Sequence, residues 1–271
     1  MPPILAHQPA HVMLPGVQPI SPKDRFVTVY GRKPVLEALA DQSLAVDKVV
    51  LAEGARGAAV SEILRAADAR SVPVHRASAH RVKVLAGNGK QDQGVLADVV
   101  APAMRSLASA LDGGDRRPRT VLVLDGVTTP ANVGMILRTA TAAGVDGIVI
   151  PRRGVAGIDP LVVKASAGMA FRAPVLRCAT AGEAAEELRA AGYPLLGLAA
   201  RAKESVFSAG LPRPAAFVLG GETAGIGDEV RRQVTGWISI PMAGDVESLN
   251  VASAAAVLCF ELRRRQLHPS G

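Results

Sequence analysis

Three short segments in the second half of the chain combine polar side chains with glycine, a composition typical of ligand-binding turns. The first, Leu124 to Ala140, contains Pro130, Asn132, Gly134 and Arg138. Pro130 and Asn132 can start a helix, and Gly134 would leave room one turn before Arg138 on the same helix face. A guanidinium above such a gap can bind a phosphate or a developing oxyanion. Taken alone, the segment fits a capping asparagine, a packing glycine and a surface arginine equally well.

The second segment, Val218 to Ile226, is a strand that runs into a glycine-rich turn with one acid, Glu222. Such a turn exposes backbone groups and lets a ligand approach closely. It lacks the lysine and hydroxyl pair of a phosphate-binding P-loop, and the chain has no G-x-G-x-x-G at a first strand-to-helix turn. Kinases and nicotinamide enzymes are therefore disfavoured.

The third segment runs from Ile238 to Ala255, where Pro241 ends a strand and Gly244 permits a turn. Ser248 or Asn250 can then cap a final helix, which places short polar groups and free amides at its positive end. Simple capping is the stronger interpretation of this segment by itself, because serine and asparagine are preferred cap residues.

The elements around these segments alternate between apolar strands and helices, which favours an α/β fold with a mostly parallel sheet covered on both faces. Ligands bind such sheets just past the carboxyl ends of the strands, where all three segments lie. The final helix starts near Asn250 and carries an apolar stripe that should pack inward, Val251, Ala255, Leu258 and Leu262. Apolar runs predict strands at Val121–Leu124, Ile148–Ile150, Leu195–Leu198, Phe217–Leu219 and Ile238–Ile240.

Composition breaks divide the chain into four parts. Six prolines crowd residues 1–25, which we expect to be a disordered tail. Residues 26–101 form a small α/β domain, residues 102–118 a flexible charged linker, and residues 119–271 the main domain. Within the small domain we expect helices at Val35–Ala40 and Ala58–Ala69, and strands at Val46–Leu51 and Val95–Val100.

Charge and cysteine content narrow the function classes. The 31 Lys and Arg against 24 Asp and Glu give a formal charge of +7, which favours an anionic partner such as nucleic acid but also fits a mildly basic enzyme. Cys178 and Cys259 are too few for a disulfide framework, and no spacing of histidine, cysteine and carboxylates indicates a metal site. No signal peptide or membrane-spanning run is evident, so a cytoplasmic protein is expected.

The three segments together resemble the signatures of the SpoU (TrmH) methyltransferases. Asn132 to Ala140 is similar to the first signature, Gly220 to Gly225 to the second, and Ile240-Pro241-Met242 with Ser248 to Val251 to the third. Three ordered motifs over about 120 residues make chance similarity improbable. The upstream stretches Val29 to Leu39 and Gln93 to Ala97 resemble the ribosomal-protein-like substrate-binding domain of that family.

This resemblance implies an RNA 2'-O-ribose methyltransferase that uses S-adenosylmethionine. It also implies a SPOUT-type catalytic domain with a C-terminal trefoil knot and a homodimer formed through that domain, to which the apolar stripe of the final helix could contribute. Donor contacts of the family map to Gly220, Ile240, Met242 and Leu249. Its catalytic positions map to Asn132, Arg138, Glu222, Ser248 and Asn250.

The chain departs from the family pattern at two positions, and the chemistry of arginine limits the role that Arg138 can have. Many members have asparagine at Gly221 and a second glycine at Thr223, so a side-chain role at Gly221 is absent here. Arginine stays protonated and is a poor base, which favours Arg138 as an electrostatic clamp on the developing alkoxide and leaves base catalysis open. Asn132, Ser248 and Asn250 would orient the ribose or the methionine, and Glu222 a polar group of the site.

The sequence leaves alternatives open for the RNA substrate and for the activity. Large-subunit 23S rRNA is favoured over tRNA. A catalytically silent RNA-binding or ribosome-assembly factor is disfavoured because all the polar motif positions are kept. A base-nitrogen methyltransferase or a generic nucleotide-binding protein fits the motif set less well.

Overall fold

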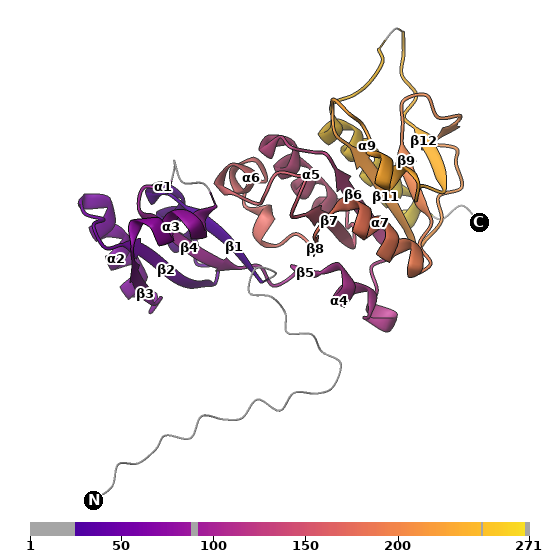
Figure 1. Ribbon diagram of the computed structural model, residues 1–271. Coiled ribbons are helices and arrows are strands. Elements are labelled where there is room, and N and C mark those ends of the chain that lie inside the picture. The colour runs from indigo at the N-terminus through magenta and orange to yellow at the C-terminus, as the bar shows by residue number, and fades with distance from the viewer. Residues whose placement is uncertain (1–24, 88–91, 245, 269–271) are drawn as a thin grey trace, which may run out of the picture.

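The computed structural model describes residues 25–87, 92–244 and 246–268, which form two sheets with helices on both faces of each (Figure 1). The α/β class is therefore confirmed. The tail expected at 1–25 lies outside the described residues except for Arg25. In the part of the chain that is described, no helix is long and apolar enough to span a bilayer.

The small domain is a four-stranded sheet in the order β1-β4-β2-β3, in which β4 runs antiparallel to both neighbours. Leu39 and Ile63 pack two helices on one face, and Val82 packs a third on the other. Its elements are β1 (Phe26–Tyr30), α1 (Arg32–Ala40), β2 (Val46–Ala52), α2 (Ala58–Ala69), β3 (Val74–Ala77), α3 (Ala79–Ala86) and β4 (Val95–Val100).

The large domain is an eight-stranded sheet in the order β10-β12-β9-β11-β6-β7-β8-β5, and every pairing between its neighbours is parallel. The mostly parallel sheet expected from the apolar runs is thus confirmed. Its elements are β5 (Arg105–Ser106), α4 (Leu107–Leu111), β6 (Thr120–Asp125), α5 (Pro130–Ala142), β7 (Gly147–Pro151), α6 (Pro160–Ala165), β8 (Val175–Cys178), α7 (Ala181–Ala190), β9 (Leu195–Leu198), β10 (Glu204–Ser205), β11 (Ala215–Gly220), α8 (Asp228–Arg231), β12 (Gly236–Ser239) and α9 (Val251–Leu267), with 3₁₀ turns at Gly114–Arg116 and Met169–Phe171.

The central strand β6 shows why its sequence is apolar at consecutive positions. Leu122 and Leu124 face the core shared with α5 and α9, whereas Val121 and Val123 face the core shared with α4 and α7. Because successive side chains of a strand point to opposite faces, a sheet covered on both sides needs apolar residues throughout.

The segment expected to be a flexible linker differs from that expectation over residues 105–111. Arg105 and Ser106 pair with β8, and α4 buries Leu107, Ala110 and Leu111 in the core on one face of the large sheet. Two leucines four residues apart lie on one helix face and are enough to pack this short helix. The sequence did not reveal it, because the helix is directly followed by charged residues typical of a linker.

Gly134 does not leave an open gap beneath Arg138. The space is filled by α6, and a Cβ on Gly134 would lie 2.5 Å from the Cβ of Ala165 and 2.7 Å from the carbonyl oxygen of Val162. Gly134 is therefore a packing residue, and Arg138 lies exposed on α5.

Gly134→Ala should lower the free energy of unfolding by about 1–3 kcal/mol, because α5 and α6 must move apart to admit the methyl group. Denaturant unfolding followed by circular dichroism measures the effect. The matched control is Gly54→Ala, since nothing lies within 4 Å of a Cβ at that position. Equal stability of the two variants would contradict close packing at Gly134.

The apolar stripe of α9 is buried within the chain. Val251, Ala255, Leu258 and Leu262 are all at most 8% exposed and belong to the same core as α5. Intramolecular packing therefore accounts for the stripe, which is unavailable as a dimer contact.

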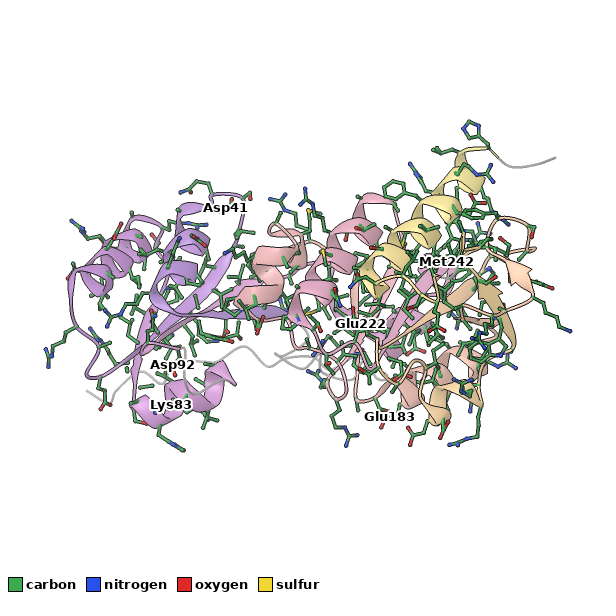
Figure 2. The ribbon with its side chains drawn as sticks, turned by 90° about the horizontal axis from the view of Figure 1, so that it is seen from above. Asp41, Lys83, Asp92, Glu183, Glu222 and Met242 are labelled. Atoms are coloured by element: carbon green, nitrogen blue, oxygen red, sulfur yellow. The ribbon has the colours of Figure 1, made fainter. Side chains whose placement is uncertain are left out.

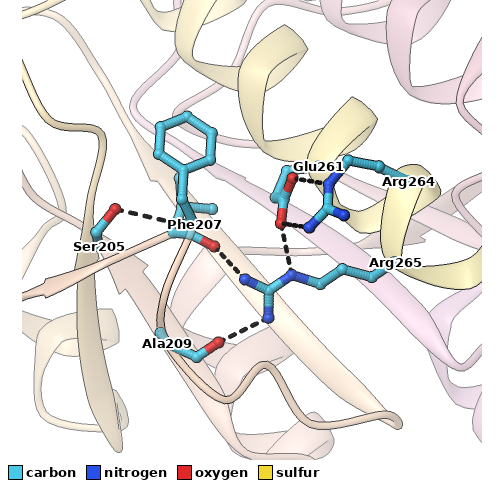
Figure 3. A network of polar contacts seen from close by, with 7 residues as sticks. Ser205, Phe207, Ala209, Glu261, Arg264 and Arg265 are labelled. Atoms are coloured by element: carbon cyan, nitrogen blue, oxygen red, sulfur yellow. Dashed lines mark hydrogen bonds and ion pairs between the residues drawn. The ribbon is translucent and has the colours of Figure 1, made fainter. Parts of the chain in front are cut away.

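Hydrogen bonds of a charged network connect the end of α9 to the loop after β10 (Figure 3). The buried Glu261 carboxylate accepts hydrogen bonds from Arg264 Nε at 2.8 Å and Arg265 Nε at 2.6 Å. Arg265 also donates to the carbonyl oxygens of Val206 and Ala209, each at 2.7 Å. One carboxylate thus orients the arginine that joins two segments distant in sequence.

Glu261 gives the fold a sensitivity to acid. Its hydrogen bonds from Arg264 and then Arg265 lower its pKa to about 2 despite its burial. A lowered folded-state pKa contributes stability that is present above the unfolded pKa, near 4.5, and is lost as the pH falls toward 2. Glu261→Gln should flatten the pH dependence of the unfolding free energy in this window, measured by urea titrations, whereas Glu186→Gln at an exposed site should not.

Candidate active site

The three polar segments meet at the carboxyl end of the large sheet. β6 and β11 are parallel neighbours, with Gly220 paired to Asp125, so the turns that follow them lie side by side. The turn after β6 leads into α5, which carries Asn132, and the turn after β11 carries Glu222. The start of α9, which carries Asn250, lies beside these two turns and completes the site. The three segments thus meet past the ends of the strands, as the sequence predicted.

Asn132, Glu222 and Asn250 form a closed polar network. Nδ2 of Asn132 donates to Oε1 of Glu222 at 2.8 Å, and Nδ2 of Asn250 donates to the same oxygen at 2.7 Å. Nδ2 of Asn250 also lies 3.1 Å from Oδ1 of Asn132. No described residue forms a hydrogen bond to Oε2 of Glu222, so that oxygen is open to a ligand.

The two asparagines have different local roles. Asn250 is the N-cap of α9, where Oδ1 accepts from the amide of Ala252 at 2.9 Å. This cap forces the amide nitrogen of Asn250 toward Glu222. Asn132 is not a cap, because α5 begins at Pro130 after Thr129, and its 5% exposed side chain serves the network instead.

A cavity of about 520 Å³ lies beside this network. The positions expected to contact the donor, Gly220, Ile240, Met242 and Leu249, all line it, as do Glu222, Ser248 and Asn250. Figure 2 shows Glu222 and Met242 on the large domain, away from the small domain. The cavity wall thus combines polar and charged side chains, among them Glu222, Asn250 and Arg231, with apolar ones.

Arg138 lines a second cavity, of about 390 Å³, between α5 and α9. Asn250 belongs to the walls of both cavities, whereas Arg138 belongs only to this one. Arg138 is exposed and forms no hydrogen bond or ion pair with another described residue. The geometry thus brings Arg138 next to the network without making it part of the network.

Comparison with known proteins agrees with this arrangement. The SpoU rRNA Methylase family matches residues 119–260, which is more than half of the chain. The chain belongs to the SpoU rRNA methylase family. Residues 28–105 match a second family, described as RNA 2'-O ribose methyltransferase substrate binding.

Relatives resemble this SpoU methylase over nearly its whole length. The 23S rRNA (guanosine-2'-O-)-methyltransferase RlmB of Xanthomonas campestris is 34% identical, over 88% of this chain and 96% of the relative. The SpoU methyltransferase AviRb of Streptomyces viridochromogenes, solved with AdoMet, is 27% identical with a TM-score of 0.58, covering 90% and 92% of the two chains. The AdoMet-bound rRNA methyltransferase of Sinorhizobium meliloti is 25% identical with a TM-score of 0.56, covering 90% and 88%.

Packing in this SpoU methylase leaves no room for a side chain at Gly221. A Cβ on Gly221 would lie 2.3 Å from the carbonyl oxygen of Gly126. Gly221 also exchanges two backbone hydrogen bonds with Gly225, at 3.1 and 2.9 Å, which closes the turn around Glu222. A side chain at 221 would therefore displace the neighbouring turn.

Sequence reasoning missed part of the cavity wall in this SpoU methylase. Leu198 ends β9 and is followed by Ala199 and Ala200, whereas Arg231 and Trp237 lie at the end of α8 and in β12. The first group was recoverable, since it continues a predicted strand past its carboxyl end. Arg231 and Trp237 carry no motif and become visible only through packing.

Proposed function

We propose that this chain methylates a ribose 2'-hydroxyl of 23S rRNA, with S-adenosylmethionine in the larger cavity and the acceptor nucleotide at the cavity of Arg138. The observation that carries the proposal is that Asn250 lines both cavities. In-line methyl transfer requires the acceptor oxygen to approach the methyl group of the donor closely, so the two ligands must occupy adjoining sites.

The larger cavity suits the donor in size and chemistry. Its volume of about 520 Å³ is within the range of small-molecule sites. Apolar walls from Leu198, Ile240 and Leu249 fit an adenine ring, while Ser248 and the open Oε2 of Glu222 offer acceptors to polar groups. When bound, the donor supplies an electrophilic methyl group on a sulfonium.

The residues of the chain then position the acceptor and stabilise charge. Arg138 would bind the developing alkoxide and an adjacent phosphate, because its guanidinium stays protonated and presents a two-pronged donor. Asn132 and Asn250 would hold Glu222 in one orientation, and Ser248 would orient the donor. Such preorganised dipoles need no rearrangement as charge develops.

The small domain would bind the RNA, and the large domain would carry out methyl transfer. Residues 26–101 carry 10 Lys and Arg against 8 Asp and Glu, a net charge of +2, so they would capture structured RNA by shape and specific contacts more than by charge. Residues 119–271 would carry catalysis, within a C-terminal trefoil knot, in a cytoplasmic protein. Likeness to RlmB over almost the whole chain supports 23S rRNA over tRNA.

Purified protein incubated with S-adenosylmethionine and either 23S rRNA or tRNA tests the proposal, with ribose methylation mapped on each RNA. We expect one methylated ribose in 23S rRNA. Methylation of tRNA alone would support the alternative substrate. RNA binding without donor binding or methyl transfer would identify a catalytically silent factor instead.

We further propose a homodimer through the exposed face of α9. Phe260 is 53% exposed on this helix, although the buried stripe of α9 is not available. Phe260→Glu should shift the mass measured by light scattering from dimer to monomer. A monomeric unaltered protein with full activity would rule this dimer out.

A further inference from the structure

Among the described residues that line the larger cavity, Arg231 is the only positively charged one. Glu222 is the only other charged residue of this set, and it already accepts hydrogen bonds from two asparagines. Arg231 ends α8 and forms no ion pair with another described residue. The cavity therefore has an exposed cation with no anionic partner among these residues.

Trp237 holds this cation in place. The guanidinium carbon of Arg231 lies 5.1 Å from the centroid of the indole, and Nη2 donates to the carbonyl oxygen of Ile226 at 3.4 Å. The indole also packs against Gly197, where a Cβ would lie 2.6 Å from Cζ3. A guanidinium stacked on a fixed ring keeps its in-plane N–H groups free for a ligand.

We propose that Arg231 pairs with the carboxylate at the methionine end of S-adenosylmethionine and selects donors that carry it; the inference rests on the proposed function. The carboxylate is the donor's anionic group, and a guanidinium fork matches a carboxylate geometrically. Adenine is neutral and finds apolar walls elsewhere in the cavity. Arg231 is thus a specificity residue for the donor.

Trp237 provides the measurement, because it is the only tryptophan of the chain and lines the cavity. Its fluorescence reports titration with S-adenosylmethionine, its decarboxylated analogue, and 5'-methylthioadenosine, which lacks the amino-acid end. Calorimetry gives the same constants independently. Arg231→Met keeps an apolar stem over the indole and removes the charge, and Arg232→Met is the matched control at an exposed neighbour outside the cavity.

Arg231→Met should weaken S-adenosylmethionine binding by about 10- to 100-fold, the usual worth of a charge-assisted hydrogen bond. Binding of the two ligands without a carboxylate should change by less than about twofold. Arg232→Met should change none of the three. Arg231→Lys should recover only part of the loss.

Equal weakening of all three ligands in Arg231→Met would overturn the inference, since Arg231 would then contact the adenosine or shape the cavity. Unchanged binding of S-adenosylmethionine would overturn it as well. Failure of the unaltered protein to bind S-adenosylmethionine at all would instead contradict the proposed function and take the inference with it.

Discussion

Arg138→Ala is expected to lower the rate of methyl transfer by about 10²- to 10³-fold, the usual effect of removing one group that stabilises developing charge. Donor affinity should stay unchanged, because Arg138 lies outside the larger cavity. The free energy of unfolding should also stay within about 0.5 kcal/mol, since the side chain is exposed. Single-turnover transfer to RNA at saturating donor measures the rate, and calorimetry measures donor binding.

Two further variants sharpen this test. Arg138→Lys should recover little activity, since an ammonium cannot reproduce the planar two-pronged geometry. Arg232→Ala removes an exposed arginine that lines neither cavity and should keep nearly full activity. Near-normal transfer by a folded Arg138→Ala protein would reject the assigned role.

Asn250→Asp is expected to reduce methyl transfer by about 10²-fold or more while keeping α9 capped. The new carboxylate still accepts from the amide of Ala252, but it replaces the amide that donates to Glu222 Oε1 at 2.7 Å. Two carboxylates at that distance repel each other and raise the pKa of one of them. Glu222 would then lose the orientation that Asn250 imposes.

The pH dependence identifies the cause. A raised folded-state pKa makes the variant relatively more stable as the pH falls, because the pair then shares a proton. The deficit in unfolding free energy of Asn250→Asp should shrink from pH 8 toward pH 5. Asn250→Ser keeps a capping oxygen without a charge and should show no such trend. The same trend in both variants would show that lost capping, and not repulsion from Glu222, causes the deficit.

Local patterns predicted the elements well where apolar residues are dense. α2, β4 and β9 begin and end where the sequence places them, since each has a clear apolar period or run and a turn at each end. The short edge strands β5 and β10 were missed, because two residues carry no measurable period. Their strand character comes from pairing with β8 and β12.

The sequence by itself determined the identity and order of the three motifs, and with them the family and the place of Asn132, Glu222 and Asn250 at strand ends. It could not determine their contacts, since Asn132 is 90 residues from Glu222 and 118 from Asn250 along the chain. The burial of Gly134 under α6 and the stacking of Arg231 on Trp237 were decided only by the tertiary structure. Both depend on the close approach of elements that are separate in the sequence. The fit of side chains at such a contact leaves no repeating pattern in the sequence of either element, so it cannot be read from the sequence.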